Sequence, residues 1–524
     1  MALRSLFGSL RRKCSQNPPF RQLYLGKKGR WRSLSSGALT SDELEESPPT
    51  GDLKSCIFRL RFPKRSATAV IQKWIGEGNK VTLSELRHIS KELRKSQRYK
   101  HALEILTWME AQKSFQMRMS AAEYAIRLEL IIKVYGLSEA EEYFENIPNR
   151  TAQRAACRPI LHSYVKERAT DKAEALMLKI HDLGLTVGPH PYNEMMKLYM
   201  ATCQFEKVAN VIQQMKQNRI PLNVLSYNLW MSSCSELSGV ASAEMVYKEM
   251  MNDKNVKVGW STHSTLANIY IKAGLVDNAI LALRTAEQKL STCNRLGYFF
   301  LITLYAALNN KEGVLRLWEA SKSVGHKMTC ANYMCIILCL VKVNDIEEAE
   351  KVFKTWESEY GKYDIRVSNV LLGAYMRKGW MEKAESLHQH TLEKGGSPNY
   401  KTWEILMEGW VKNQQMDKVI TAMKKGFAML KHCHWRPSTA IIMSIADYFE
   451  EHGNLEDSKK YVKVLQKLGL VSLPLYKSLL RVHIRAGKPA PKVLLMMDKD
   501  KIEIDEEASA LIRSLNKISI EDKA

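Results

Sequence analysis

A small or aliphatic residue recurs along this chain at intervals close to 35 residues. The intervals range from 33 to 39 residues, and six of the ten are 35. A regular period of this length indicates stacked units of supersecondary structure, none of which can bury its apolar face without its neighbours. The 524 residues are therefore expected to form an array of repeats rather than one compact core. The recurring positions, called the ladder below, are Ala102, Ala140, Ala173, Val208, Ala243, Ala279, Val314, Ala349, Ala384, Val419 and Ser458.

One unit is clearest between Pro189 and Asn223. Apolar residues there follow a helical period twice, over residues 191–201 and 205–217, with a brief turn between them. The ladder residue lies in the second helix of each unit. The prediction is an all-α fold, an α-solenoid of about 11–12 helix-turn-helix repeats of roughly 35 residues. The repeats are expected to begin at Leu83, Ala121, Arg154, Pro189, Val224, Trp260, Arg295, Cys330, Ile365, Tyr400, Thr439 and Leu473.

The first 41 residues hold nine Lys or Arg and no acid. Leu and Phe side chains between residues 3 and 10 share one face of a helix, and arginines crowd the other. Amphipathic, Arg- and Ser-rich segments without acids are typical of transit peptides and lack the continuous apolar stretch of a secretory signal. We interpret residues 1–34 as a mitochondrial transit peptide, with the chloroplast as the less favoured destination. The alternative is a basic nucleic-acid-binding tail kept on the mature protein.

The rest of the chain divides by composition and period. Residues 35–52 are acidic and contain proline, as linkers do, and residues 53–82 are expected to hold an N-terminal capping helix. The solenoid proper is predicted over residues 83–472. Residues 473–524 are expected to form a degenerate last repeat and a C-terminal cap or tail, because Gly487 and two prolines interrupt the second helix and the chain then becomes acidic.

The charge of the chain favours a polyanionic partner. The formal net charge is +22, and without the first 41 residues the chain still holds 69 basic and 56 acidic side chains. Nucleic acid is the commonest polyanion, although an acidic protein or a membrane surface would also be attracted. No apolar stretch approaches the roughly 18 residues of a membrane-spanning helix, so no membrane insertion is expected.

The sequence contains no recognisable catalytic motif. There is no C-x-x-C pair, which a zinc deaminase requires, and no phosphate-binding G-x-x-x-x-G-K-[ST] loop. The triplet His432-Cys433-His434 lacks further partners at metal-ligand spacing. Acids are scattered on the second helices, as is typical of solvated faces. We therefore expect no enzyme activity, no cofactor and no metal.

The internal pattern of the repeat is more specific than its length. First helices open with Tyr192-Asn193 or Tyr227-Asn228, and loops end with Ile220-Pro221-Leu222-Asn223 or Gly396-Ser397-Pro398-Asn399. Together with residues 273–279 (AGLVDNA), these features resemble the pentatricopeptide repeat (PPR) family over residues 83–505. The nearly uniform spacing resembles the plain-repeat (P) class, which is commonest in plant organelles.

The resemblance implies a right-handed superhelix whose first helices line a concave groove for single-stranded RNA. One repeat faces one base, which is read by the fifth residue of the repeat together with its last. Asn with Asn resembles a pyrimidine reader and Ser with Asn an adenine reader, because amide and hydroxyl groups can bond a base edge. The base-reading candidates by this correspondence are Asn193, Asn223, Asn228, Ser264, Asn294, Asn369 and Asn399.

Other repeats depart from this pattern, which leaves the function open among three hypotheses. In six other repeats the fifth residue is Arg87, Arg158, Phe299, Met334, Glu404 or Met443. The first hypothesis is an organellar RNA-binding protein acting in RNA stability, processing, splicing or translation. The second is a structural component of the mitochondrial ribosome or another ribonucleoprotein, bound to ribosomal RNA and to protein partners. The third is a peptide-binding helical scaffold.

The thirteenth residue of the repeat is basic in eight of twelve registers. In the PPR family a lysine at this position lies near the RNA backbone, and phosphate contacts supply affinity without sequence information. The alternative is that each cation complements a helix dipole and stays solvated. The backbone-contact candidates are Lys95, Lys133, Lys166, Lys272, Lys342, Arg377, Lys412 and Arg485.

Aromatic and methionine residues also recur at fixed positions. They could stack on bases, but a place in the core between repeats is the favoured interpretation. These residues are Tyr199, Tyr270, Tyr305 and Tyr375 late in first helices, and Met215, Met250 and Trp318 on second helices.

Overall fold

The structure is a computed structural model that describes residues 52–60, 66–112, 119–147, 149–182, 184, 188–325, 327–429, 436–452 and 455–521. The predicted transit peptide, the linker up to residue 51 and the triplet His432-Cys433-His434 lie outside the described residues. The described part of the chain forms 27 helices and no strand. None of these helices combines the length and the low polarity that crossing a membrane requires.

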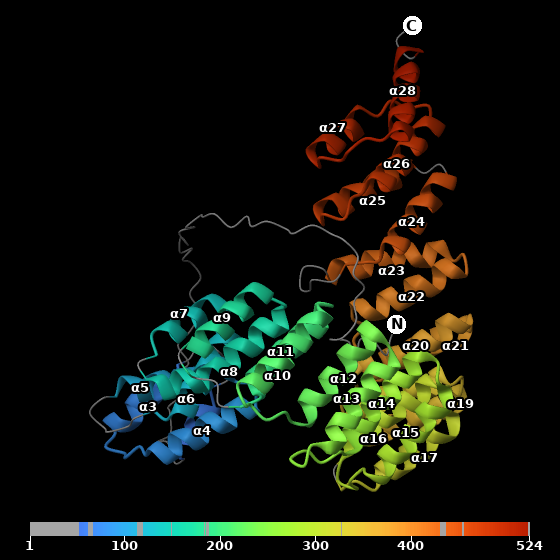
Figure 1. The fold of residues 1–524 in the computed structure, drawn as a ribbon. Helices are drawn as coiled ribbons and strands as arrows, with labels where there is room; N and C mark the ends of the chain where they lie inside the picture. The colour runs from blue at the N-terminus through green and yellow to red at the C-terminus, as the bar shows by residue number, and fades with distance from the viewer. Residues whose placement is uncertain are drawn as a thin grey trace. The chain divides into compact units, whose positions relative to one another are not determined.

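The helices belong to two compact units, one up to Lys289 and one from Leu290 onward. Figure 1 shows the succession of helices along the chain. The helices of the first unit are α2 (Leu53–Phe58), α3 (Ala67–Gly76), α4 (Leu83–Lys95), α5 (Tyr99–Ala111), α6 (Ala121–Val134), α7 (Leu137–Glu145), α8 (Arg150–Glu167), α9 (Thr170–Asp182), α10 (His190–Ala201), α11 (Phe205–Gln217), α12 (Val224–Ser238), α13 (Val240–Asn252), α14 (Trp260–Ala273) and α15 (Val276–Gln288).

The second unit continues the same alternation of helices. Its helices are α16 (Arg295–Ala307), α17 (Lys311–Lys322), α18 (Cys330–Lys342), α19 (Ile346–Glu359), α20 (Ile365–Lys378), α21 (Met381–Glu393), α22 (Tyr400–Lys412), α23 (Met416–Ala428), α24 (Thr439–Glu451), α25 (Leu455–Lys467), α26 (Leu473–Arg485), α27 (Pro491–Lys499) and α28 (Glu506–Glu521).

The helices from α4 to α27 form twelve consecutive pairs among the described residues, which confirms the predicted α-solenoid of helix-turn-helix repeats. Ten first helices begin at the predicted residue, and the fourth begins one residue later than predicted, at His190. The third instead begins at Arg150, because Asn149 accepts the Thr151 N–H at 2.7 Å and caps the helix there. The predicted interruption in the last repeat delays its second helix to Pro491 and shortens it to nine residues.

The ladder marks where the repeats pack most tightly. Its ten Ala and Val residues are fully buried, and Ser458 is 4% exposed. A small side chain at this point allows the second helix of a repeat to approach the first helices on both sides, which is why larger residues are absent there. The same close contact between helices therefore recurs about every 35 residues.

A single left-handed residue turns the chain from the first to the second helix in most repeats. The position is Gly274 or Gly379 in two of them, but it is Cys203, Asn344 or Gln414 in others, with φ between 57° and 63° in these last three. Non-glycine residues in this region cost about 1–2 kcal/mol each. The contacts made by the two long helices outweigh that cost.

A hydrogen-bonded contact recurs between neighbouring repeats. A Tyr late in a first helix donates to a Glu on the preceding second helix, and a Lys of the same repeat as the Tyr binds that carboxylate. The Glu follows a ladder residue and the Lys precedes the next one. We name this set the tyrosine clamp, and its complete examples are Tyr164–Glu141–Lys172, Tyr199–Glu174–Lys207 and Tyr375–Glu350–Lys383.

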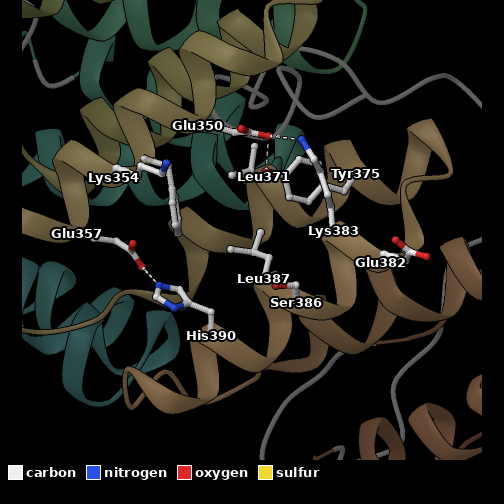
Figure 2. Close-up of a pocket in the computed structure, with 11 residues that line it drawn as sticks. Glu350, Lys354, Glu357, Leu371, Tyr375, Glu382, Lys383, Ser386, Leu387 and His390 are labelled. Atoms are coloured by element: carbon white, nitrogen blue, oxygen red, sulfur yellow. Dashed lines mark hydrogen bonds and ion pairs between the residues drawn. The ribbon is translucent and has the colours of Figure 1, made fainter.

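Figure 2 shows the clamp at Glu350, whose Oε1 lies 2.7 Å from Tyr375 Oη and 3.1 Å from Lys383 Nζ. The clamp borders an open cavity of about 490 Å³ lined by side chains of α19, α20 and α21. The prediction that the acids on second helices are only solvated is wrong at these positions, because each carboxylate accepts hydrogen bonds from two side chains.

The recurring aromatic and methionine residues lie in the core between repeats, as predicted. Tyr199, Tyr305, Tyr375, Trp318, Met215 and Met250 are at most 7% exposed. Tyr270 is half-buried and donates to Glu244 at 2.8 Å. Their rings fill space between helices and are not available to stack on a base.

Candidate nucleic-acid interface

The first helices of consecutive repeats pack on one another within each unit. The contacts run from α6 through α8, α10 and α12 to α14, and from α16 through α18, α20, α22 and α24 to α26. The fifth, ninth and thirteenth residues of a repeat are spaced four apart on the first helix, so they lie along one side of it. The predicted base-reading and backbone-contact residues therefore share a side of this layer of first helices.

The two amides predicted to act together in the fourth repeat bond to each other. Asn193 on α10 donates from Nδ2 to Asn223 Oδ1 at 3.2 Å. Asn223 is the N-cap of α12 and accepts the Ser226 N–H at 3.0 Å. The Ser226 hydroxyl donates to Asn193 Oδ1 at 2.8 Å. Asn193 is 3% exposed, whereas Asn223 is exposed.

The ninth repeat contains the same arrangement. Asn369 on α20 donates to Asn399 Oδ1 at 3.3 Å, and Asn399 caps α22 by accepting the Thr402 N–H at 3.1 Å. The Thr402 hydroxyl donates to Asn369 Oδ1 at 3.0 Å. Sequence reasoning missed the hydroxyl residue, although the spacing Asn-x-x-Ser or Asn-x-x-Thr at a helix start is the signal of a capping box.

The remaining predicted readers are not joined in this way. Asn228 on α12 pairs with Gly259, which has no side chain, and its Oδ1 is buried without a hydrogen-bond partner among the described residues. Ser264 on α14 donates back to the Trp260 carbonyl at 2.8 Å within its own helix. Asn294 caps α16 by accepting the Gly297 N–H at 3.0 Å.

Two departures from the reading pattern are firmly held by the fold. Arg87, the fifth residue of the first repeat, forms a bidentate ion pair with Glu123 at 2.6 and 2.9 Å. Phe299, the fifth residue of the seventh repeat, is 3% exposed and its ring lies edge-on to Trp318 at 6.2 Å. Neither side chain is placed to bond a base.

Four cations of the thirteenth-residue column are paired with acids. Lys95 and Lys133 bond Glu92 and Glu129 of their own helices at 2.7 and 2.6 Å. The other two pairs connect neighbouring repeats: Lys272 binds Glu236, and Arg485 Nη2 lies 3.7 Å from Glu450 Oε1. Arg485 Nη1 also donates to the Glu450 backbone carbonyl at 2.6 Å.

The other four cations of the column are exposed and have no ion pair or hydrogen bond with a described residue. They are Lys166, Lys342, Arg377 and Lys412. Partial burial lowers the pKa of both Lys342 and Arg377, and the charge of Glu408 opposes this effect at Arg377. The last three occupy consecutive first helices, α18, α20 and α22.

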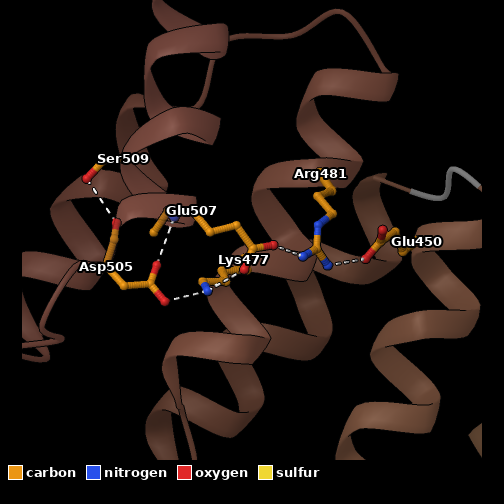
Figure 3. Close-up of polar contacts among 7 residues, drawn as sticks. Glu450, Lys477, Arg481, Asp505, Glu507 and Ser509 are labelled. Atoms are coloured by element: carbon orange, nitrogen blue, oxygen red, sulfur yellow. Dashed lines mark hydrogen bonds and ion pairs between the residues drawn. The ribbon is translucent and has the colours of Figure 1, made fainter.

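Two further cations of α26 are bound by acids at the start of the C-terminal helix α28. Lys477, the fifth residue of the last repeat, bonds Asp505 and Glu507 at 2.6 Å each (Figure 3). Arg481, the ninth residue, is held between Glu507 and Glu450. Helix α28 packs on α26 in the way that a further first helix would, and its acids neutralise the cations of that helix.

Stacked helix pairs with amides and cations along one side of the first helices define a helical-repeat protein of the α-solenoid class. Comparison with known proteins specifies the family. The pentatricopeptide repeat domain profile matches residues 175–236, and the PPR repeat profile matches residues 332–359 and 367–396. The chain belongs to the pentatricopeptide repeat family, as the following relatives show.

One pentatricopeptide repeat-containing protein of Arabidopsis thaliana is 53% identical over 90% of this chain and 95% of its own length. A second Arabidopsis thaliana member, labelled mitochondrial, is 37% identical over 74% of this chain and 96% of its own length. A crystal structure of the pentatricopeptide repeat protein PPR10 from maize aligns at 15% identity with a TM-score of 0.46, over 86% of this chain and 70% of that one.

Proposed function

We propose that this chain is a single-stranded RNA-binding protein of the plain-repeat PPR class, acting in the post-transcriptional metabolism of RNA in plant mitochondria. One observation carries the proposal. Lys342, Arg377 and Lys412 form an unpaired basic row on three consecutive first helices, on the side that also presents the Asn369–Asn399 pair. The mitochondrial location is supported by the acid-free basic N-terminus and by the label of relatives such as the 37% identical Arabidopsis protein.

The row suits a phosphodiester backbone. A single strand carries one charge per nucleotide, and cations that recur once per repeat can meet it at regular intervals. Neutralising phosphates releases counterions, which supplies affinity without regard to sequence. The paired cations Lys95, Lys133, Lys272 and Arg485 contribute less, because an acid already neutralises each of them. Base discrimination is then left to the fourth and ninth repeats, where the amide pairs are assembled.

Replacement of the three cations of this row tests the proposed contacts with the RNA backbone. We expect the variant Lys342→Ala/Arg377→Ala/Lys412→Ala to bind a random pool of short single-stranded RNA more weakly. The slope of log K against log salt should fall by about 2, since each lost contact to a single strand removes about 0.7. The measurement is a fluorescence anisotropy titration at several salt concentrations with the full chain.

A matched variant controls for net charge. Lys248→Ala/Arg284→Ala/Lys354→Ala removes two lysines and one arginine from second helices, where these side chains are exposed and unpaired among the described residues. Its salt slope should stay close to that of the wild type. Equal losses in both triple variants would show that only overall charge matters and would contradict the proposed backbone contacts.

A second candidate function is structural, within the mitochondrial ribosome or another ribonucleoprotein. The observation that favours it is the loss of readable fifth positions, such as Arg87 in its ion pair and Phe299 in the core. Crosslinking in purified mitochondria, with a sucrose gradient of the same lysate, separates the two functions. Short footprints in a few messenger transcripts in light fractions support the first function, and ribosomal RNA crosslinks with co-migration in a subunit support the second.

A further inference from the structure

The third residue of a repeat reaches back to the fifth residue of the repeat before it. Ser226 does so to Asn193, and Thr402 does so to Asn369. Both hydroxyl residues are fully buried, so neither touches a ligand directly. Their effect on a bound base must act through the amides that they contact, which assumes the proposed RNA-binding function.

The backbone sets the orientation of the capping amide in each pair, which is exposed at Asn223 and half-buried at Asn399. The Ser226 N–H lies 3.0 Å from Asn223 Oδ1, and the Thr402 N–H lies 3.1 Å from Asn399 Oδ1. A backbone N–H can only donate, so the oxygen of each cap faces its helix. The NH₂ group of Asn223 and that of Asn399 must then point away from the helix start.

The hydroxyl sets the orientation of the other amide. The Ser226 Oγ accepts the Asn223 N–H at 3.2 Å, and its single proton lies closer to Asn193 Oδ1, at 2.8 Å, than to Asn223 Oδ1, at 3.2 Å. With its oxygen facing the hydroxyl, Asn193 turns its Nδ2 toward Asn223 Oδ1, which can only accept. In the ninth repeat the Asn399 N–H lies 3.1 Å from the Thr402 hydroxyl, and the same order of bonds follows. Both amide oxygens are used internally, and only N–H groups remain for a ligand.

We infer that Ser226 and Thr402 are positioning residues that make these two amide pairs donors toward a bound nucleotide. A donor-only pair complements a base edge that presents acceptors, such as the carbonyl oxygens of uracil or the O2 and N3 atoms of cytosine. Adenine presents only one acceptor on the same edge, N1, beside an exocyclic amino group that is itself a donor and finds no acceptor in the pair. Specificity at these two repeats thus depends on a residue that belongs to the next repeat.

The fifth repeat is a natural comparison, because it has the hydroxyl but not the cap. Thr262 is the third residue of the repeat that follows the one containing Asn228, but Gly259 stands where the capping amide would be. The Thr262 hydroxyl lies 3.9 Å from Met250 Sδ, and Asn228 Oδ1 is left buried without a partner among the described residues. All three residues are therefore needed to orient the amide of the fifth position.

The loss-of-function test removes the two hydroxyls at constant shape. We expect Ser226→Ala/Thr402→Val to lower the preference for pyrimidine over adenine at the two nucleotides facing the fourth and ninth repeats by about fivefold. Overall affinity for random RNA and its salt slope should not change. The conservative exchange Ser226→Thr/Thr402→Ser should keep the preference. A randomised-RNA selection with sequencing measures the base preference of the wild type and of both variants, and the anisotropy titration measures affinity and salt slope. An unchanged preference in the Ala/Val variant would overturn the inference.

A gain-of-function test avoids any dependence on lost stability. Gly259 has φ −121° and ψ −170°, close to the −117° and 177° of Asn223, and a Cβ atom there would meet nothing within 4 Å. Gly259→Asn should therefore complete the hydrogen-bonded set and give the fifth repeat a new pyrimidine preference. Gly259→Asn/Thr262→Val should not do so.

The outcomes separate this inference from the proposed function. If the double variant Gly259→Asn/Thr262→Val gains the same preference as Gly259→Asn alone, the hydroxyl has no positioning role. If the wild type binds RNA with a steep salt slope but selects no base at any position, the inference fails while the backbone grip remains. If the wild type binds no single-stranded RNA, the proposed function fails as well.

Discussion

At the scale of single residues, two glycines in first helices of the second unit meet very different surroundings. A Cβ atom on Gly409 would lie 2.3 Å from Met376 Sδ and 2.9 Å from its Cβ. A Cβ atom on Gly373 would lie 3.2 Å from the end of the Arg377 side chain and 3.8 Å from Ile405. The first glycine is required for close approach of α22 to α20, whereas the second only costs helix propensity.

We predict that Gly409→Ala lowers the free energy of unfolding by about 1–3 kcal/mol, because Met376 and the helix behind it must shift. Gly373→Ala is the matched control, and it should raise the free energy of unfolding by up to about 1 kcal/mol, since alanine is the better helix former and Arg377 can move. Urea unfolding followed by circular dichroism measures both. Similar effects of the two exchanges would show that the contact at Gly409 does not limit packing.

At the level of helices, the tyrosine clamps join the second helices α7, α9 and α19 to the first helix of the next repeat. The hydrogen bond from Lys207 lowers the pKa of Glu174 below its ordinary value of 4.5, and that from Lys418 does the same for Glu385. Trp410 Nε1 replaces the tyrosine at Glu385, at 3.3 Å. A carboxylate whose pKa is depressed in the folded state stabilises the fold above pH 4.5, and this contribution is lost as pH falls below that value.

We therefore predict that the free energy of unfolding of Glu174→Gln/Glu385→Gln falls less steeply than that of the wild type as pH is lowered from about 5 to about 3. At neutral pH the double variant should be less stable by about 1–2 kcal/mol, as expected for partly exposed charge-assisted hydrogen bonds. Glu206→Gln/Glu382→Gln changes exposed, unpaired carboxylates on α11 and α21 and should leave the pH profile unaltered. A wild-type profile for the clamp variant would rule out this role.

At the scale of the whole molecule, each unit is a one-dimensional stack, and a stack needs an end. Helix α28 supplies it: Ala508 and Leu515 are buried, and Asp505 and Glu507 bind the cations of α26. The helix therefore covers apolar surface that a further repeat would otherwise cover. Its acids also neutralise two cations of α26, Lys477 and Arg481.

We predict that Asp505→Asn/Glu507→Gln strengthens RNA binding and steepens the salt slope by about 1, because Lys477 and Arg481 are released to bind phosphate. The control Glu503→Gln/Glu506→Gln makes the same change in net charge at exposed carboxylates that have no partner among the described residues. Its salt slope should change less. Equal slopes in the two variants, measured by the same anisotropy titration, would mean that the acids of α28 do not limit the basic surface.

The sequence by itself determined the class of fold and most of its boundaries. The ladder and the capping residues recur with one period, and a helix start depends mainly on local signals such as Asn223 before Val224. The candidate readers and cations followed from the resemblance to the family, applied in the same register. The start of α8 at Arg150 was missed, because the ladder predicts an average spacing and not the local cap at Asn149.

Only the tertiary structure decided which of these side chains are available. Lys272 and Lys412 occupy the same register, yet Glu236 neutralises the first and no described residue pairs with the second. Asn193 and Asn228 are the same residue at the same position, but a cap 30 residues later joins Asn193 into a hydrogen-bonded set and leaves Asn228 without one. Repeat spacing is a local, periodic property of the chain, whereas a side chain's hydrogen bonds depend on residues that only stacking brings within reach.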